Sequence, residues 1–150
     1  MEHVLTGFAE EARIRKAEEA HEMGIDDALI SALVDQFYAR IRSHPSLGPI
    51  FARRVREWPV HLGRMKAFWG SIAIESGRYH GNPMLKHVAI GEIREEHFSD
   101  WLALWASTVK DVIRDDRAAE FFNSRAKRIA QSLTMGIALH GERQRQTTSL

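Results

Sequence analysis

The sequence contains no cysteine, which excludes disulfide bonds, thiolate metal sites and a cysteine nucleophile. It also lacks an excess of one charge, because 21 basic residues stand against 20 acidic residues for a net charge of +1. This balance indicates neither a nucleic-acid partner nor a membrane-surface partner. No apolar run approaches the roughly 18 residues of a membrane span, and the charged residues 1–24 lack the apolar core of a signal peptide. We therefore expect a cytoplasmic protein.

The apolar residues that are present recur with a helical period. A stripe with a four-residue repeat runs through residues 25–42: Ile25, Leu29, Leu33, Phe37 and Ile41. Comparable stripes cover residues 59–76, 95–114 and 116–140, and no segment alternates as a strand would. The pattern predicts an all-α protein.

The same pattern predicts how the chain is divided. One domain spans residues 25–140, a length of chain that can bury a sizeable core. The charged residues 1–24 form an N-terminal extension that we expect to be a polar helix of marginal stability, and residues 141–150 are expected to be a disordered tail. The stretch "HPSLGPIF" at residues 44–51 contains two prolines and a glycine, which predict turns.

A short apolar segment, "NPMLKHVAIG" at residues 82–91, contains one imidazole, that of His87. Pro83 suits the first position of a helix, and Gly91 ends the apolar run. A helix of this length is too short to be stable by itself. It therefore needs a partner that holds it in place.

Two of the eight histidines, His61 and His87, lie on apolar helical faces, whereas the others lie in loops, near termini or in charged runs. Such a histidine is often a core residue hydrogen-bonded to a carbonyl. Tyr38 and Trp101 also lie within apolar stripes, so the interior would hold several polar groups that each cost about 1–3 kcal/mol if unpaired. A buried cofactor would use these groups.

The residue types favour haem over other cofactors. A closed zinc site needs four clustered ligands, no HExxH motif is present, and the one Glu-x-x-His match, Glu18 to His21, lies in the charged N-terminal stretch. Haem needs one axial imidazole and an apolar slot with large side chains. Methionine and aromatic residues at helical spacing are also typical of a plain core. The residues by themselves therefore leave open a cofactor-free helical interaction domain.

Four segments then carry a resemblance: "FYARIRSHPSLGPIF", "WPVHLGRMKAFWGSI", "YHGNPMLKHVAI" and "FSDWLALW". In this order and register they resemble the group III truncated haemoglobins over about residues 26–140. The resemblance implies a truncated globin fold, in which a two-over-two helix sandwich surrounds haem b (iron protoporphyrin IX).

The resemblance also implies roles for individual residues. His87 matches the proximal ligand of the iron, and Tyr38, His61 and Trp101 match residues that face the bound ligand. The further haem-contacting positions are Phe37, Phe51, Arg64, Met65, Phe68, Trp69 and Met84. His61 either closes the pocket or coordinates the iron directly, and the sequence leaves both roles open.

The function implied is the binding of O2 or another small diatomic ligand in a polar pocket. Donors from Tyr38 and Trp101 would stabilise bound O2 and slow its dissociation, which disfavours simple O2 delivery. Nitric oxide dioxygenation or peroxide detoxification with an external reductase suits such a pocket better. The alternatives are a haem-based sensor that signals to a separate partner and the cofactor-free interaction domain.

Overall fold

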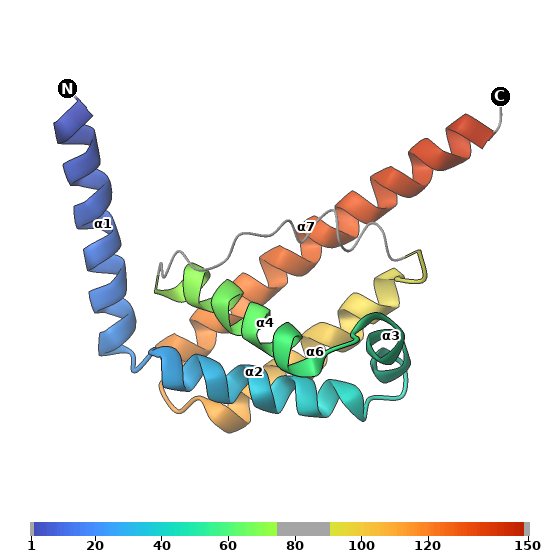
Figure 1. Cartoon of the computed structure of the whole chain (residues 1–150), viewed down its shortest axis with the longest axis horizontal. Helices are drawn as coiled ribbons and strands as arrows, with labels where there is room; N and C mark the ends of the chain where they lie inside the picture. Colours follow the sequence, from blue (N-terminus) through green and yellow to red (C-terminus); the bar gives the residue numbers. More distant parts are fainter. Residues whose placement is uncertain (1, 75–90, 149–150) are drawn as a thin grey trace.

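The computed structural model describes residues 2–74 and 91–148, and side chains over residues 7–74 and 91–141. Within these ranges the chain forms helices and no strand, which confirms the predicted all-α class (Figure 1). The helices are α1 (Glu2–Glu22), α2 (Asp27–Arg42), α3 (Leu47–Arg54), α4 (Trp58–Ala73), α6 (Glu95–Val112) and α7 (Asp116–Thr148). The short helix predicted around Met84 and His87 lies outside the described residues.

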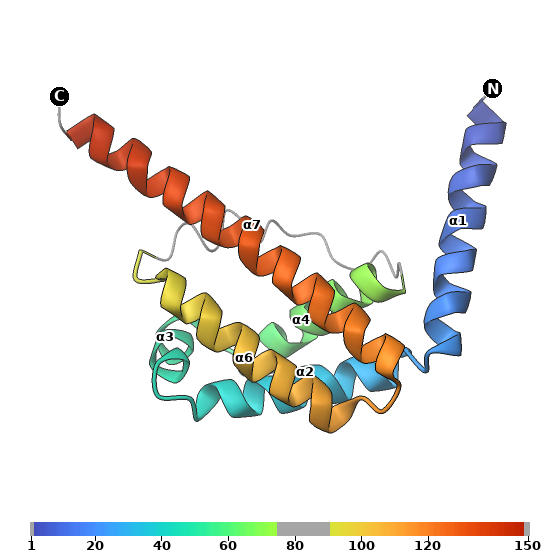
Figure 2. The ribbon, with the colours of Figure 1, turned by 180° about the vertical axis from the view of Figure 1, so that it is seen from behind.

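Four helices form two packed pairs. α2 packs on α4 and α6 packs on α7, and α2 also contacts α6, so that the two pairs are joined (Figures 1 and 2). Figure 2 shows α6 and α7 in front of α2 and α4, as expected for the predicted two-over-two sandwich. The core lies between the pairs and is built largely from fully buried residues of α2 and α7: Ile30, Leu33, Val34, Phe37, Ile41, Ala118, Phe122 and Ala126.

The sequence of α2 explains why this segment is helical. The Asp26 carboxylate accepts a hydrogen bond from the Leu29 N–H at 2.8 Å and caps the first turn, where Asp27 adds a second negative charge. The four-residue repeat of large apolar side chains then faces the core. This helix is the scaffold that positions Phe37 and Tyr38.

α3 corrects the prediction of turns around Pro45, Gly48 and Pro49. Pro49 is the third residue of the helix, within the first turn, where its missing N–H breaks no helical hydrogen bond. A Cβ atom at Gly48 would lie 2.9 Å from the Arg42 carbonyl oxygen, so glycine permits the close approach of α3 to the end of α2. The His44 ring is half-buried and accepts a hydrogen bond from the Ser46 N–H at 3.2 Å.

Both ends of the chain form helices that leave the body of the protein (Figure 1). α1 is helical as expected and is anchored near its C-terminal end by buried Ala20, while its Phe8 side chain is 62% exposed. α7 continues to Thr148, past the end predicted at residue 140, so that the predicted irregular tail is helical over residues 141–148. Among the described residues, no helix has an apolar stretch long enough to cross a membrane.

Candidate functional site

Three aromatic rings from two helices lie against the ring of the Tyr38 side chain, which is 6% exposed. The centroid of its phenol ring lies 5.8 Å from that of Phe51 on α3, 6.1 Å from that of Trp58 and 5.0 Å from that of His61. Trp58 and His61 are three residues apart on α4, which puts them on one face of that helix. We call Tyr38, Phe51, Trp58 and His61 the polar aromatic cluster.

This cluster contains buried polar groups. A tyrosine phenol is protonated at neutral pH, and burial raises the pKa of Tyr38 further above its ordinary value, so the hydroxyl can act as a donor. No hydrogen bond to this hydroxyl is formed among the residues whose side chains are described. The Nε2 atom of His61 is buried as well. The cluster therefore combines an apolar wall with groups that can contact a small polar ligand.

Trp58 was not among the predicted site residues, although it lies one turn before His61. Its indole is half-buried and stacks at 25° on Phe51, with 6.4 Å between the ring centroids. On the solvent side, the exposed guanidinium of Arg42 lies 4.6 Å from the Trp58 ring centroid, a cation–π contact. Exposure thus rises from Tyr38 through Trp58 to Arg42, which places this pair at the outer edge of the cluster.

Beyond His61, α4 continues as a half-buried apolar face made of Leu62, Met65, Phe68 and Ile72. Met65 and Phe68 are two of the predicted haem contacts, and Arg64 beside them is exposed. Trp69, a further predicted haem contact, is 3% exposed, and its ring lies against Phe122 in the core, at 5.7 Å between centroids.

Three tryptophans form a second aromatic group, which we call the tryptophan stack. The Trp105 ring is nearly parallel to that of Trp69, at 16° and 4.5 Å between centroids, and to that of Trp101, at 8° and 5.8 Å. Phe37 meets Trp101 edge-on at 5.5 Å and Tyr38 at 5.2 Å. Phe37 thus connects the stack, including the predicted site residue Trp101, to the polar aromatic cluster.

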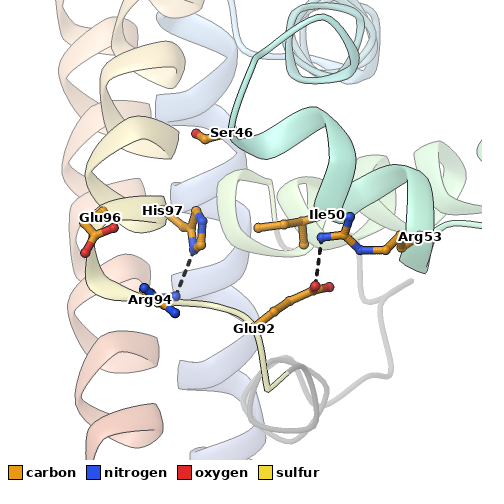
Figure 3. A pocket seen from close by; sticks show the side chains of 7 residues that line it. All are labelled: Ser46, Ile50, Arg53, Glu92, Arg94, Glu96 and His97. Carbon is orange, nitrogen blue, oxygen red and sulfur yellow. Dashed lines mark hydrogen bonds and ion pairs between the residues drawn. The ribbon is translucent and has the colours of Figure 1, made fainter.

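A charged hollow of about 310 Å³ lies at another corner, between α3 and the start of α6 (Figure 3). Its lining residues are Ser46, Ile50, Arg53, Glu92, Arg94, Glu96 and His97, and they include none of the predicted site residues. Glu92 accepts hydrogen bonds from Arg53 at 2.8 Å and from Arg54 at 3.3 Å, and these cations lower the pKa of its carboxyl group. These ion pairs attach the chain at residue 92 to α3, which carries Phe51.

The structure thus brings together Tyr38, His61 and Phe51 directly, and it links Trp101 to them through Phe37. The predicted iron ligand His87 and the predicted contact Met84 lie outside the described residues. In the part of the chain that is described, no group of three or more histidine, aspartate or glutamate side chains is placed to hold a metal ion.

Comparison with known proteins gives two relatives and one solved structure. Group 3 truncated hemoglobin ctb of Campylobacter jejuni is 28% identical over 110 residues, which cover 71% of this chain and 86% of that protein. Group 2 truncated hemoglobin YjbI of Bacillus subtilis is 31% identical over 112 residues, which cover 73% of this chain and 83% of that protein.

The crystal structure of group III truncated hemoglobin from Campylobacter jejuni matches with a TM-score of 0.72 and 27% identity, over 75% of this chain and 91% of that one. No protein-family model matches the chain. The resemblance to group III that the four sequence segments indicated is confirmed, and the chain belongs to the truncated haemoglobin family.

Proposed function

We propose that this protein binds haem b along the half-buried face of α4 and holds O2 or another diatomic ligand beside Tyr38 and His61. We further propose that it carries out redox chemistry on that ligand, and not simple O2 delivery. The observation that carries the proposal is the Tyr38 side chain, which is 6% exposed, lies among aromatic rings and has a protonated hydroxyl that forms no hydrogen bond to the other described residues.

The residues present fit a haem. A porphyrin is flat and largely apolar, and α4 offers a half-buried apolar face with Met65 and Phe68, bounded at one end by Phe51. The exposed Arg64 beside this face suits a propionate group. By resemblance, His87 would hold the iron. When bound, haem supplies a redox-active iron that takes O2 or a related ligand.

The chain's own contribution is to hold the ligand. The Tyr38 O–H donates a hydrogen bond to a ligand that carries partial negative charge, and the low local dielectric of the cluster strengthens this bond. The indole N–H of Trp101 is the second donor implied by the resemblance. Each such bond is worth about 1 kcal/mol, so together they slow dissociation by more than about tenfold. Slow release suits nitric oxide dioxygenation or peroxide turnover, for which an external reductase supplies electrons.

His61 has one of two roles in this proposal. Its ring lies 5.0 Å from that of Tyr38 and 5.7 Å from that of Trp58, which supports a position in the wall of the ligand pocket. There it either closes the pocket or coordinates the iron when no ligand is bound. A six-coordinate low-spin absorption spectrum that is lost in His61→Ala establishes coordination, whereas a high-spin spectrum of the unmutated protein excludes it.

The proposal is tested by the rate of O2 dissociation from the Tyr38→Phe variant. We expect a rate about five- to tenfold faster, equivalent to the loss of about 1–1.4 kcal/mol from one hydrogen bond. The matched control is Thr134→Val, which also removes a hydroxyl but on α7, where Thr134 donates to the Ala130 carbonyl. An unchanged rate in Tyr38→Phe contradicts the assignment of this hydroxyl to the bound ligand.

A further inference from the structure

Three of the four tryptophans of this chain share one stack, and the fourth, Trp58, lies apart in the polar aromatic cluster. In the stack the rings are nearly parallel, at 16° and 8°, with centroids 4.5 and 5.8 Å apart. Offset-parallel stacking and edge-to-face contact are the two arrangements that aromatic rings prefer, and this core uses both, since Phe37 meets Trp101 and Trp105 edge-on. The three indoles, which are among the most easily oxidised side chains, therefore lie in direct ring contact from Trp101 through Trp105 to Trp69.

The stack runs from the proposed pocket into the interior. Trp101 is half-buried and contacts Phe37, which in turn contacts Tyr38. Trp105 is 1% exposed and Trp69 is 3% exposed, so the inner two rings are shielded from solvent. A charge on the inner two rings is therefore close to the pocket but protected from reaction with solvent, whereas the half-buried Trp101 is the ring that water can reach.

We propose that the tryptophan stack is an internal electron donor: when a peroxide is reduced in the pocket, an electron leaves Trp101 and the positive charge is shared with Trp105 and Trp69. This inference rests on the proposed function, because the reduction of peroxide requires bound haem. It assigns a redox activity to the core of the protein in addition to ligand binding.

The surroundings favour oxidation of an indole over oxidation of the nearby phenol. A phenol gives up its proton when it is oxidised, but burial raises the pKa of Tyr38, and no hydrogen-bonded acceptor for its proton is present among the described residues. An indole can lose an electron and keep its N–H. The Trp105 N–H donates to the Phe122 carbonyl at 3.2 Å, and this neutral acceptor stabilises a positive ring without removing its proton.

The neighbouring rings add to this stabilisation. The face of an aromatic ring carries negative potential and attracts a cation within about 6 Å of its centroid. Trp105 has such a face on each side, from Trp69 and from Trp101. A positive charge on any ring of the stack is therefore stabilised by at least one parallel neighbour.

The electrons and protons balance with an external donor. Hydrogen peroxide takes up two electrons and two protons to give two waters. The stack supplies one electron and is refilled by a one-electron reductant, such as a reduced flavin, which also supplies the second electron, and solvent supplies the protons. Without a reductant, the oxidised indole loses a second electron and two protons in total and gains one oxygen atom from water.

The test uses the haem-loaded full chain, with its Soret band and carbon monoxide shift recorded first. The protein is mixed with hydrogen peroxide without reductant, frozen and examined by electron paramagnetic resonance. We expect an organic radical whose spectrum narrows when the protein is grown with ring-deuterated tryptophan and stays unchanged with ring-deuterated tyrosine. This measurement needs no substitution in the core.

Peptide mass spectrometry then locates the oxidised residue. Trypsin separates Trp58 in residues 57–64 from Trp69 in residues 67–78 and from Trp101 and Trp105 in residues 95–110. We expect oxygen to be gained by residues 95–110, which contain the half-buried Trp101, and not by residues 57–64. Trp58 is the matched control, because it lies in the polar aromatic cluster beside His61 but outside the stack.

Two tryptophan-to-phenylalanine variants test whether the radical lies on the stack. Trp105→Phe interrupts the stack and should lose most of the indole radical signal, whereas Trp58→Phe should keep it. A radical on tyrosine, oxygen gained by residues 57–64 in place of 95–110, or a Soret band with no protein radical overturns this inference and leaves the proposed function standing. A protein with no Soret band overturns the proposed function and this inference with it.

Discussion

The tryptophan stack and the polar aromatic cluster meet on α2 at two adjacent residues, Phe37 and Tyr38, yet they differ in what they bury. In the stack, the buried Trp105 N–H donates a hydrogen bond to the Phe122 backbone carbonyl of α7. The polar aromatic cluster holds the Tyr38 hydroxyl, which forms no hydrogen bond within the described part of the chain, and ends in a cation at its outer edge. Two adjacent side chains of α2 therefore have different surroundings: Phe37 packs in the core, and Tyr38 lies where we propose that the ligand binds.

The difference in hydrogen bonding between Trp105 and Tyr38 affects the stability of the folded protein. The Tyr38 side chain is 6% exposed, so its hydroxyl has little access to water, and a bound ligand that accepts its hydrogen bond stabilises the folded protein. In the stack, by contrast, the buried Trp105 donor is satisfied within the protein by the Phe122 carbonyl. The contrast supports a ligand-binding role for the polar aromatic cluster and a packing role, with the proposed redox role, for the stack.

Phe37→Ala should have the largest effect, because Phe37 contacts both the tryptophan stack and the polar aromatic cluster and is 0% exposed. We expect the free energy of unfolding to fall by about 3–5 kcal/mol, the usual loss when a buried phenylalanine is truncated. Urea denaturation followed by far-ultraviolet circular dichroism measures this loss. Phe8→Ala, on the exposed part of α1, should change it by less than about 0.5 kcal/mol. Equal effects of the two variants would contradict the assignment of Phe37 to the shared core.

Arg42→Met should affect the polar aromatic cluster alone, because it removes the cation over Trp58 and leaves the tryptophan stack unchanged. We expect a loss of about 0.5–1 kcal/mol in unfolding free energy, together with faster association of carbon monoxide as the Trp58 indole loosens. The matched control is Arg125→Met, since Arg125 makes the same kind of contact with Phe121 on α7, at 5.3 Å. If flash photolysis shows equal association rates in both variants, Trp58 does not border the route to the pocket.

Glu92→Gln should give the smallest effect, and it should depend on pH. The pKa of Glu92 is lowered chiefly by its hydrogen bond to Arg53, so the charged carboxylate stabilises the folded state above the ordinary glutamate pKa of 4.5. We expect the variant to be slightly less stable than the unmutated protein at neutral pH. As pH falls below 4.5 and the carboxylate takes up its proton, the difference should disappear. Thermal melts from pH 7 to pH 3 check this, and a difference that is constant with pH would contradict it.

The helices that hold the site could be predicted from the sequence, because apolar stripes at helical spacing mark α2, α4, α6 and α7. The resemblance placed Tyr38, His61 and Phe51 in one pocket, and the structure brings their rings together. α3 was missed because its proline and glycine are typical of turns when their place within a first helical turn is unknown.

Other features could not be predicted because they depend on how helices cross. Arg42 reaches Trp58 only because the end of α2 lies beside the start of α4, and no local pattern encodes this contact. Trp69 lies next to Phe68 on α4, but its ring turns into the core, where Trp105 from α6 supplies a parallel face. The stack is thus a product of tertiary packing.

The most direct test of the account is the absorption spectrum of the purified protein as isolated, reduced, and reduced under carbon monoxide. The account predicts a Soret band that shifts with carbon monoxide, that is lost or altered in His87→Ala, and that is unchanged in the control His140→Ala, whose side chain is exposed on α7. A colourless protein that also fails to take up added haemin would contradict the haem proposal and favour a cofactor-free helical interaction domain.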